Sequence, residues 1–246
     1  MCELLAAAAA EPFALGELWE TAAGLERYGV AAFGWGAAWL TPEGTIAHHV
    51  STAAFRDDPA QFALADIRTT ALMVHLRRPS KLSTIGLPDA QPFIDPKGRF
   101  AFSHNGDLAG FRTIRPRYLE QGRIAGRADS EVGQRWLEDR WAEHAPGLDR
   151  PSPDDPGAPD PCRALAALHD ELGGQANLMA LTPSGVTHVH AGNTENPVFR
   201  YRLGRMGIVS TALYSIDRSL FRLVARTATD RHLLRPGQRY HLAPGA

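Results

Sequence analysis

The sequence opens with Met1-Cys2-Glu3-Leu4-Leu5 and continues with five alanines at 6–10, so a thiol directly precedes an apolar run. A small residue at position 2 permits removal of the initiator Met, which leaves the thiol and a free α-amine on one residue. The pKa of an α-amine is roughly 8 and that of a thiol about 8.5, so the amine can accept the thiol proton near neutral pH. Cys2 is therefore a candidate nucleophile that needs no separate base. The alternative is an incidental small residue.

The apolar run at 4–10 is not typical of a secretory signal, because Glu3 precedes it and the first basic residue is Arg27. Charged residues interrupt every stretch that approaches the roughly 18 apolar residues needed to cross a bilayer. Two cysteines, Cys2 and Cys162, are too few for a disulfide framework. We expect a cytoplasmic protein with no membrane contact.

Composition favours one globular domain over residues 1–246. Lys and Arg total 26 against 27 Asp and Glu, and this balance excludes the electrostatic footprint of a nucleic-acid-binding protein. A Pro- and Asp-rich segment at about 145–161 has the composition of a solvated loop. Strand patterns resume after it, so we interpret it as an insertion within one domain rather than a boundary.

The apolar patterning predicts an α+β fold. Strand-like segments lie at 29–40, 45–50, 71–76, 100–104, 176–181, 186–190 and 205–210. Helical spacing is found at 15–26, 131–144 and 162–172. Strands and helices do not alternate strictly, which favours α+β layers over a doubly wound parallel sheet.

The sequence His104-Asn105-Gly106-Asp107-Leu108 follows the apolar segment at 100–103. An Asn amide and a Gly backbone N–H can point at one small site, and fixed donors of this kind stabilise a developing oxyanion. The alternative is that Asn-Gly is simply a turn, the commoner use of this dipeptide.

Six short motifs together resemble the class II glutamine amidotransferases in order and spacing across most of the chain. They are Met1-Cys2-Glu3-Leu4-Leu5, Gly34-Trp35-Gly36, His75-Leu76-Arg77-Arg78-Pro79-Ser80, Gln91-Pro92-Phe93, His104-Asn105-Gly106 and Asp129-Ser130-Glu131. The chain is most similar to the stand-alone members, which include a γ-glutamyl hydrolase of ergothioneine biosynthesis. The resemblance implies the four-layer αββα sandwich of the N-terminal-nucleophile hydrolases.

The resemblance also implies roles for individual residues. Cys2 would form a γ-glutamyl thioester, with Asn105 and the Gly106 N–H as the oxyanion hole. Arg77 would hold the substrate α-carboxylate with help from Ser80, a pairing that suits a planar guanidinium. Asp129 would bind the substrate α-ammonium. On the residues alone, Arg77 is equally a solvated strand-end charge and Asp129 a helix cap.

Three positions depart from the family pattern and affect the expected pocket wall. Phe33 stands where a polar residue is usual, Gln91 replaces His, and Pro79 replaces Ala. None of these touches the nucleophile or the oxyanion hole. They bear on which substrate is accepted.

No metal site is expected. His48-His49 and His188-x-His190 offer imidazoles, but no nearby carboxylate or Cys completes a ligand set. Cys162 starts a predicted helix, where its pKa could fall, although a packed inert thiol is the alternative. A run of basic residues either binds an anionic partner or is a solvated face: Arg112, Arg115, Arg117, Arg123 and Arg127.

The expected reaction is hydrolysis of the γ-amide of glutamine or of a γ-glutamyl compound, releasing glutamate and an amine or ammonia without a cofactor. One alternative is a glutaminase subunit that delivers ammonia to a separate synthase partner. A second is a catalytically inactive binding module of the same fold.

Overall fold

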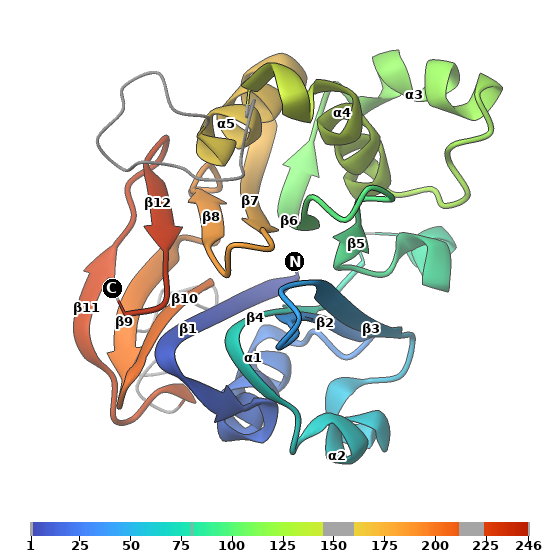
Figure 1. The fold of residues 1–246 in the computed structure, drawn as a ribbon. Helices are drawn as coiled ribbons and strands as arrows, with labels where there is room; N and C mark the ends of the chain where they lie inside the picture. Colours follow the sequence, from blue (N-terminus) through green and yellow to red (C-terminus); the bar gives the residue numbers. More distant parts are fainter. Residues whose placement is uncertain (1, 80, 145–159, 212–223, 246) are drawn as a thin grey trace.

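The computed structural model describes residues 2–79, 81–144, 160–211 and 224–245 (Figure 1). Ser80 and most of the Pro- and Asp-rich segment, residues 145–159, therefore lie outside the described residues. The α-helices in the described part are α1 (Trp19–Gly29), α2 (Ala60–Leu64), α3 (Phe111–Glu120), α4 (Asp129–His144) and α5 (Pro161–Leu172).

The described strands form two antiparallel sheets. The seven-stranded sheet of the described residues has the order β11-β9-β10-β1-β4-β2-β3, and the five-stranded sheet has the order β12-β8-β7-β6-β5. The first contains β1 (Glu3–Ala14), β2 (Trp35–Leu40), β3 (Ile46–Ser51), β4 (Arg68–Leu76), β9 (Val198–Leu203), β10 (Met206–Thr211) and β11 (Thr229–Leu233). The second contains β5 (Phe93–Ile94), β6 (Ala101–Leu108), β7 (Gly174–Leu181), β8 (Thr187–His190) and β12 (Arg239–Leu242).

Strand β1 lies at the centre of the larger sheet, between β10 and β4, and is buried on both faces. Leu4, Ala6 and Ala8 pack in the core between the two sheets. The alternate residues, from Leu5 onward, pack against helix α1. Burial on both faces explains the uninterrupted apolar run, because neither face needs polar side chains.

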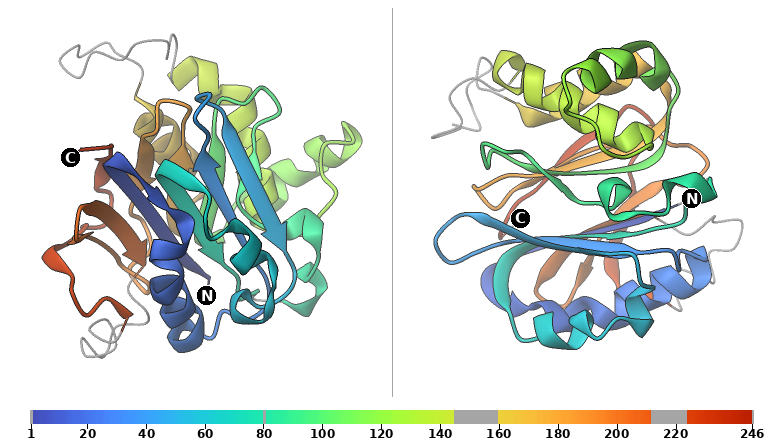
Figure 2. Two further views of the ribbon diagram at one scale, coloured as in Figure 1. Left: turned by 60° about the horizontal axis from the view of Figure 1, so that its bottom comes forward. Right: turned by 90° about the vertical axis from the view of Figure 1, so that its right-hand side faces the viewer.

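The two sheets lie face to face between two layers of helices, as the right-hand view of Figure 2 shows. Helix α1 covers the outer face of the larger sheet, where Trp19 and Leu25 join its core. Helices α4 and α5 cover the outer face of the smaller sheet, where Trp141 and Leu168 join Phe102. The four-layer αββα sandwich is thus confirmed.

The predicted strand at 29–40 is wrong in its first half. Helix α1 continues to Gly29, and β2 begins only at Trp35. Val30 has a φ of 53° and Gly34 a φ of 126°, and neither backbone conformation continues a strand. The other predicted strands and the three predicted helices are present, with shifted ends.

The interpretation of Asn105-Gly106 as a turn is also wrong. Strand β6 runs through both residues and pairs them with Asn177 and Ala176 of β7. The two residues therefore lie inside a sheet, where their positions are held by the neighbouring strand. No helix in the described part of the chain is long and apolar enough to cross a bilayer.

Candidate active site

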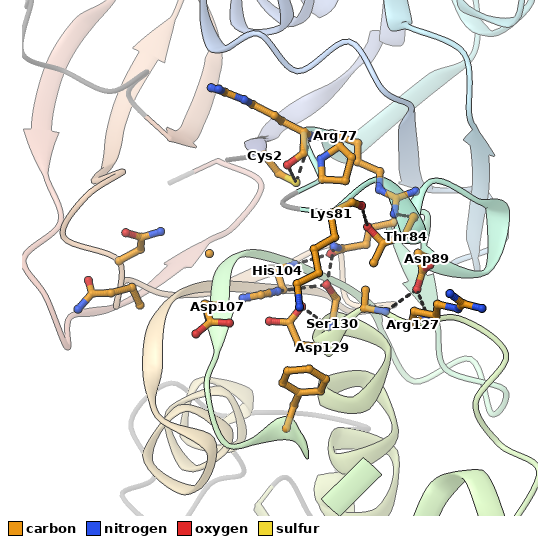
Figure 3. Close-up of a pocket in the computed structure, with 18 of the residues that line it drawn as sticks. Cys2, Arg77, Lys81, Thr84, Asp89, His104, Asp107, Arg127, Asp129 and Ser130 are labelled. Atoms are coloured by element: carbon orange, nitrogen blue, oxygen red, sulfur yellow. Dashed lines mark hydrogen bonds between the residues drawn. The ribbon is translucent and has the colours of Figure 1, made fainter. Parts of the chain in front are cut away.

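A cavity of about 430 Å³ opens where Cys2, the end of β4, strand β6 and the start of α4 meet (Figure 3). Four of the six residues given catalytic or substrate-binding roles in the sequence analysis line it: Cys2, Arg77, Gly106 and Asp129. Asn105 is fully buried and lies behind this wall. Ser80 is outside the described residues. The fold thus brings together motifs that are far apart along the chain.

Cys2 directly precedes β1 and its thiol lies against the backbone of Arg78. The Arg78 N–H donates to Sγ at 3.4 Å, and the thiol faces the Arg78 carbonyl at 3.7 Å. Burial raises the pKa of the Cys2 thiol, whereas the Arg78 N–H and the charge of Arg77 lower it. The donor and the cation therefore favour the thiolate against the cost of burial.

The Asn105 side chain is oriented by neighbouring asparagines. Its Oδ1 accepts from Asn177 Nδ2 at 3.0 Å and from Asn193 Nδ2 at 3.4 Å. With its oxygen held there, Nδ2 points toward the nucleophile and donates to the Cys2 carbonyl. Asn196 Nδ2 approaches the same carbonyl at 3.3 Å. An amide nitrogen has two N–H groups, so one remains for a second acceptor beside Cys2.

Gly106 occupies a position that admits no side chain. Its φ is 123°, and a Cβ built there would lie 1.8 Å from the Gln175 carbonyl oxygen of the paired strand. It would also lie 2.8 Å from Asn193 Nδ2. A glycine at this point therefore lets β6 keep its pairing while its backbone faces the cavity.

Arg77 is only 4% exposed, so the interpretation as a solvated strand-end charge is wrong for this residue. Its guanidinium donates to the carbonyls of Gly86, at 3.1 Å, and of Thr84. Burial lowers the pKa of Arg77, and nearby Cys2 and Asp89 act in the opposite direction. A guanidinium carries five N–H groups, and those beyond the two carbonyl contacts suit a carboxylate in the cavity.

Asp129 lies both at the start of helix α4 and at the cavity. It is the first residue of α4, and its Oδ1 accepts from the Ser130 N–H at 3.0 Å. Its Oδ2 accepts from the Leu108 N–H at 2.8 Å, which ties the helix to the end of β6. The carboxylate also lines the cavity, and its remaining lone pairs suit an ammonium group.

Gln91, noted above as a departure from the family pattern, builds the wall between these residues. Its Oε1 accepts from the His104 N–H at 2.6 Å, and its Nε2 donates to Ser130 Oγ at 3.0 Å. His104 Nδ1 lies 3.2 Å from the same hydroxyl. Gln91 thus connects β6 to the start of α4. Phe33, by contrast, does not line the cavity and is 39% exposed.

Asp89 is a wall residue that the sequence reasoning missed. Its Oδ1 accepts from the backbone N–H groups of Arg127 and Ala128 at 2.6 and 2.7 Å. It is buried and orders the loop that leads into α4. No spacing or composition marked this residue, because its partners are backbone groups 38 and 39 positions away.

The basic run after β6 divides into two groups. Arg117 and Arg123 form ion pairs with Asp139 of α4 at 3.3 and 2.7 Å, as expected for a solvated face. Arg112 and Arg127 instead line the cavity, together with Lys81. The cavity therefore has cations beyond the position of Arg77.

Cys162 lies on the outer side of the smaller sheet and is fully buried, so the interpretation as a packed thiol is confirmed and that of a lowered pKa is wrong. Burial and the charge of Asp160 raise the pKa of the Cys162 thiol to about 12. The expectation that neither a carboxylate nor a Cys lies near His188 is wrong as well, because the fold places Asp160, Cys162 and His241 beside it.

Two antiparallel sheets between helix layers, with a cysteine immediately before the central strand, define the N-terminal-nucleophile hydrolase class. A family model for the class-II glutamine amidotransferases matches residues 1–200. The chain belongs to this family. No curated protein matched it.

Solved structures share the fold. The glutamine phosphoribosylpyrophosphate (PRPP) amidotransferase from B. subtilis, complexed with ADP and GMP, superposes with a TM-score of 0.69 at 16% identity, covering 98% of this chain and 47% of that one. An allosteric regulatory enzyme of purine biosynthesis gives 0.68 at 15% identity, with coverage of 98% and 46%. This chain therefore spans about half the length of those two.

A glutamine aminotransferase class-II domain protein from Silicibacter pomeroyi gives a TM-score of 0.60 at 17% identity. The match covers 97% of this chain and 94% of that one. At such identities these likenesses concern the fold alone.

Proposed function

We propose that this chain is an amidohydrolase that cleaves the γ-amide of glutamine or of a γ-glutamyl compound through a thioester on Cys2. The observation that carries the proposal is the shared cavity of Cys2, Gly106, Arg77 and Asp129. A nucleophile, a backbone donor, a cation and an anion are the groups needed to attack an amide and to hold an amino acid by both its charges.

The reaction begins with removal of Met1, which exposes the Cys2 α-amine. Sγ attacks the γ-carbonyl carbon while the α-amine takes the thiol proton. The tetrahedral oxyanion is stabilised by Asn105 Nδ2 and the Gly106 N–H. Its collapse forms the thioester and breaks the C–N bond, and the α-amine delivers the proton to the departing nitrogen. Water then attacks the thioester, releasing glutamate and restoring the thiol.

Substrate recognition rests on two opposite charges. Arg77 pairs with the α-carboxylate and Asp129 with the α-ammonium of the glutamyl group. Ser80 assists Arg77. Both proposed contacts involve the glutamyl half alone, so the clamp does not select the leaving amine.

A leaving group larger than ammonia is supported by the size of the cavity. Its volume of about 430 Å³ falls in the range of roughly 300–1,000 Å³ that small-molecule sites occupy. Lys81, Arg112 and Arg127 line it in addition to the proposed clamp. Asp89, Asp107 and Glu195 line it as well, so the charges of the wall do not select the charge of the leaving amine. A cytoplasmic location suits the reactive Cys2 thiol.

The second candidate is a glutaminase subunit that passes ammonia to a separate synthase partner. The family name and the approximately half-length coverage of two structural neighbours favour it. A catalytically inactive binding module is the third.

The deciding experiment is intact and peptide mass spectrometry after incubation with a γ-electrophilic glutamine analogue. We expect loss of Met1 and one covalent adduct on Cys2. The Cys2→Ala variant is the control and should remain unlabelled. Retention of Met1 in protein purified from the native host would defeat the mechanism, and an unlabelled Cys2 would favour the binding module.

A substrate panel separates the two enzymatic candidates. We expect larger γ-glutamyl amides to exceed free glutamine in kcat/KM. Free glutamine as the best substrate, with turnover that rises on addition of a partner protein, would establish the glutaminase subunit instead.

A further inference from the structure

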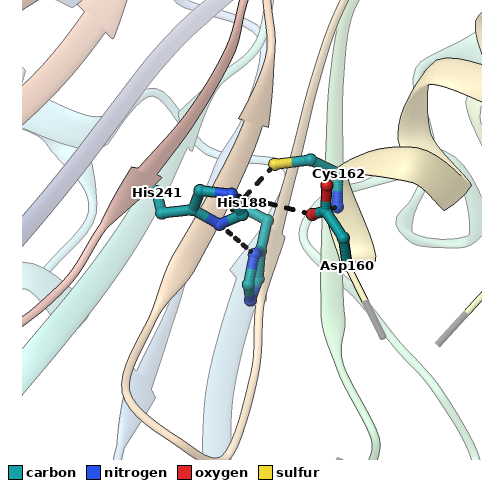
Figure 4. A group of neighbouring side chains, drawn as sticks. All are labelled: Asp160, Cys162, His188 and His241. Carbon is teal, nitrogen blue, oxygen red and sulfur yellow. Dashed lines mark hydrogen bonds and ion pairs between the residues drawn. The ribbon is translucent and has the colours of Figure 1, made fainter. Parts of the chain in front are cut away.

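A second cluster of reactive side chains lies on the outer side of the smaller sheet, apart from the cavity (Figure 4). It consists of Asp160, Cys162, His188 and His241, and one potential ligand atom of each lies within 4.8 Å of the others. None of these residues lines the cavity of Cys2. The cluster therefore requires its own explanation.

Three separate elements bring these side chains together. His188 of β8 and His241 of β12 are direct partners in the antiparallel pairing, so their side chains share one face of the sheet. Cys162 lies in the first turn of α5, which covers that face. Asp160 caps the same helix and accepts from the Cys162 N–H at 2.9 Å.

The donor set is that of a zinc-type site. One sulfur, two imidazole nitrogens and one carboxylate oxygen are ligands that Zn²⁺ takes in tetrahedral geometry. Bonds of about 2.3 Å to sulfur and 2.0–2.1 Å to nitrogen place such ligand atoms roughly 3.3–3.6 Å apart. Here His241 Nδ1 lies 3.8 Å from Cys162 Sγ and 2.9 Å from His188 Nδ1. These two separations differ from that geometry by about half an ångström or less, and all four ligand atoms lie within 4.8 Å of one another.

The ring of His188 is already oriented for such a role. Its Nε2 lies 3.4 Å from Thr182 Oγ1, and that hydroxyl donates to the Val186 carbonyl at 3.1 Å. The hydroxyl oxygen can thus accept a hydrogen bond from the Nε2–H group of His188. The lone pair of His188 Nδ1 is then directed into the cluster. Metal-binding histidines characteristically donate their other N–H to an outer partner in this way.

The charges around the cluster also favour a cation. Cys162 Sγ faces the carbonyls of Val189 and Tyr240, both at 3.6 Å, beside the carboxylate of Asp160. One cation competes: Arg239 Nη1 lies 3.2 Å from Asp160 Oδ2.

A second histidine pair provides an internal comparison. His169 Nδ1 and His190 Nε2 are 2.9 Å apart, the same separation as in the cluster. Within the described residues, however, no sulfur or third ligand joins that pair to form a metal-binding group. A close His–His contact alone therefore does not distinguish the cluster, and the added Cys and Asp do.

We propose that Asp160, Cys162, His188 and His241 bind one divalent transition-metal ion of the zinc type. Four protein ligands leave no open position, so the ion has a structural role, holding the start of α5 against β8 and β12. On binding, the Cys162 thiol releases its proton to solvent and the thiolate bonds to the ion.

The test is titration of the metal-free full-length chain with Co²⁺, which reports a thiolate ligand and tetrahedral geometry through its absorption spectrum. We expect one Co²⁺ per chain, an intense sulfur-to-cobalt charge-transfer band, and displacement of Co²⁺ by Zn²⁺. The titration is made in the Cys2→Ala background, so that no signal comes from the other thiol. Because the readout is metal binding, its failure leaves the proposed hydrolase untouched.

Matched variants locate the site. Cys162→Ser and His241→Asn should each weaken binding by more than about 100-fold, beyond the usual effect of losing an outer-shell partner. The His241 side chain is 50% exposed, so that variant is expected to fold even if Cys162→Ser does not. His190→Gln, in the control pair, should bind as the parent does.

The proposal would be overturned by absence of the charge-transfer band in the parent, or by a band of unchanged intensity in both ligand variants. A band that disappears with His190→Gln would also overturn it, because the metal would then lie at the other histidine pair.

Discussion

The two cysteines of this chain contrast in surroundings although both lie against backbone groups. Cys2 Sγ accepts a hydrogen bond from the Arg78 N–H and lies near the positive charge of Arg77. Cys162 Sγ faces two carbonyls and has the negative charge of Asp160 nearby. Cys2 is half-buried at a cavity, and Cys162 is completely buried.

The contrast shows that the sign of the neighbouring groups, rather than the thiol itself, determines what a cysteine can do. At Cys2 the protein supplies the donor and cation that a thiolate needs. At Cys162 the neighbours oppose the thiolate, so that an added cation must supply the missing positive charge. The predictions below test this contrast.

The largest effect is expected from Cys2→Ala. If Cys2 is the nucleophile, glutamate release from a γ-glutamyl amide should fall by about 10⁴-fold or more, as on loss of other covalent nucleophiles. Initial-rate kinetics measure this, with the melting temperature as a control for folding. A variant that retains a tenth of the parent rate would show that Cys2 is not the nucleophile, and the functional contrast between Cys2 and Cys162 would then be wrong.

Gly106→Ala tests whether the backbone next to Cys2 tolerates a side chain. The added Cβ collides with the Gln175 carbonyl, so we expect a loss of about 10²–10³-fold in kcat, comparable to removal of an oxyanion donor. The stability should fall too, as measured by urea unfolding.

Gly122→Ala is the matched control for this variant. Gly122 also has a positive φ, of 65°, but a Cβ there meets nothing within 4 Å. The Gly122→Ala variant should lose only about 1–2 kcal/mol of folding stability, the cost of a non-glycine residue in the left-handed conformation, and its kcat should be unchanged. Equal losses of kcat in the two variants would show that the collision is irrelevant.

Glu3→Gln probes the acidic residue that follows Cys2 in the chain. Glu3 is buried, contacts Asn196 and Thr211, and burial raises its pKa to about 7 from an ordinary 4.5. The pKa of Glu3 is higher in the folded chain than in the unfolded chain, so the folded state is stabilised by the protonated carboxyl. This contribution to the free energy of unfolding is complete below pH 4.5 and is lost as the pH rises through 7.

Relative to the parent, Glu3→Gln should therefore gain up to about 3 kcal/mol between pH 4 and pH 8. Urea unfolding of both proteins across this interval gives the difference. A difference that does not change with pH would mean that Glu3 has an ordinary pKa in the folded chain.

Alkylation separates the two thiols directly. In the metal-free folded chain, iodoacetamide should modify Cys2 at least about 100-fold faster than Cys162, because Cys162 reacts only after local opening that costs a few kcal/mol. Peptide mass spectrometry gives both rates in one sample, with urea-unfolded chain as the reference in which the rates converge. Similar rates in the folded chain would contradict the burial contrast.

Much of the cavity could be predicted from the sequence because its residues stand in short motifs. Cys2, Arg77, Gly106 and Asp129 were identified in this way, and the fold brings them to one wall. The roles assigned to them remain predictions. Gln91 was noted as a departure, but its connection between β6 and α4 depends on contacts 13 and 39 positions away.

Strand β1 and helix α3 were missed for opposite reasons. The β1 segment is rich in alanine, which has little preference for strands, and burial on both faces removes the alternation that marks a strand. In helix α3, Phe111, Ile114 and Tyr118 lie at helical spacing, but Pro116 and three arginines stand among them. In both, packing against other elements decides the structure.

The cluster at Cys162 was beyond sequence reasoning for a third reason. Its members lie on β8, β12 and the start of α5, and His188 and His241 are 53 positions apart. Spacing identifies ligands only when they share one local element. Here the pairing of β8 with β12 brings His188 and His241 together.

The central strand β1 is made first, but one of its two neighbouring strands, β10, is made near the end of synthesis. The Leu4 N–H donates to Thr211 Oγ1 at 2.9 Å, 207 positions later in the chain. At about 5–20 residues per second, a ribosome needs roughly 10–40 s to make that stretch. Until β10 has been made, β1 lacks one of its two neighbouring strands, and its apolar residues are only partly covered. During this interval the apolar residues of β1 are partly exposed, so this is when the nascent chain most needs a chaperone.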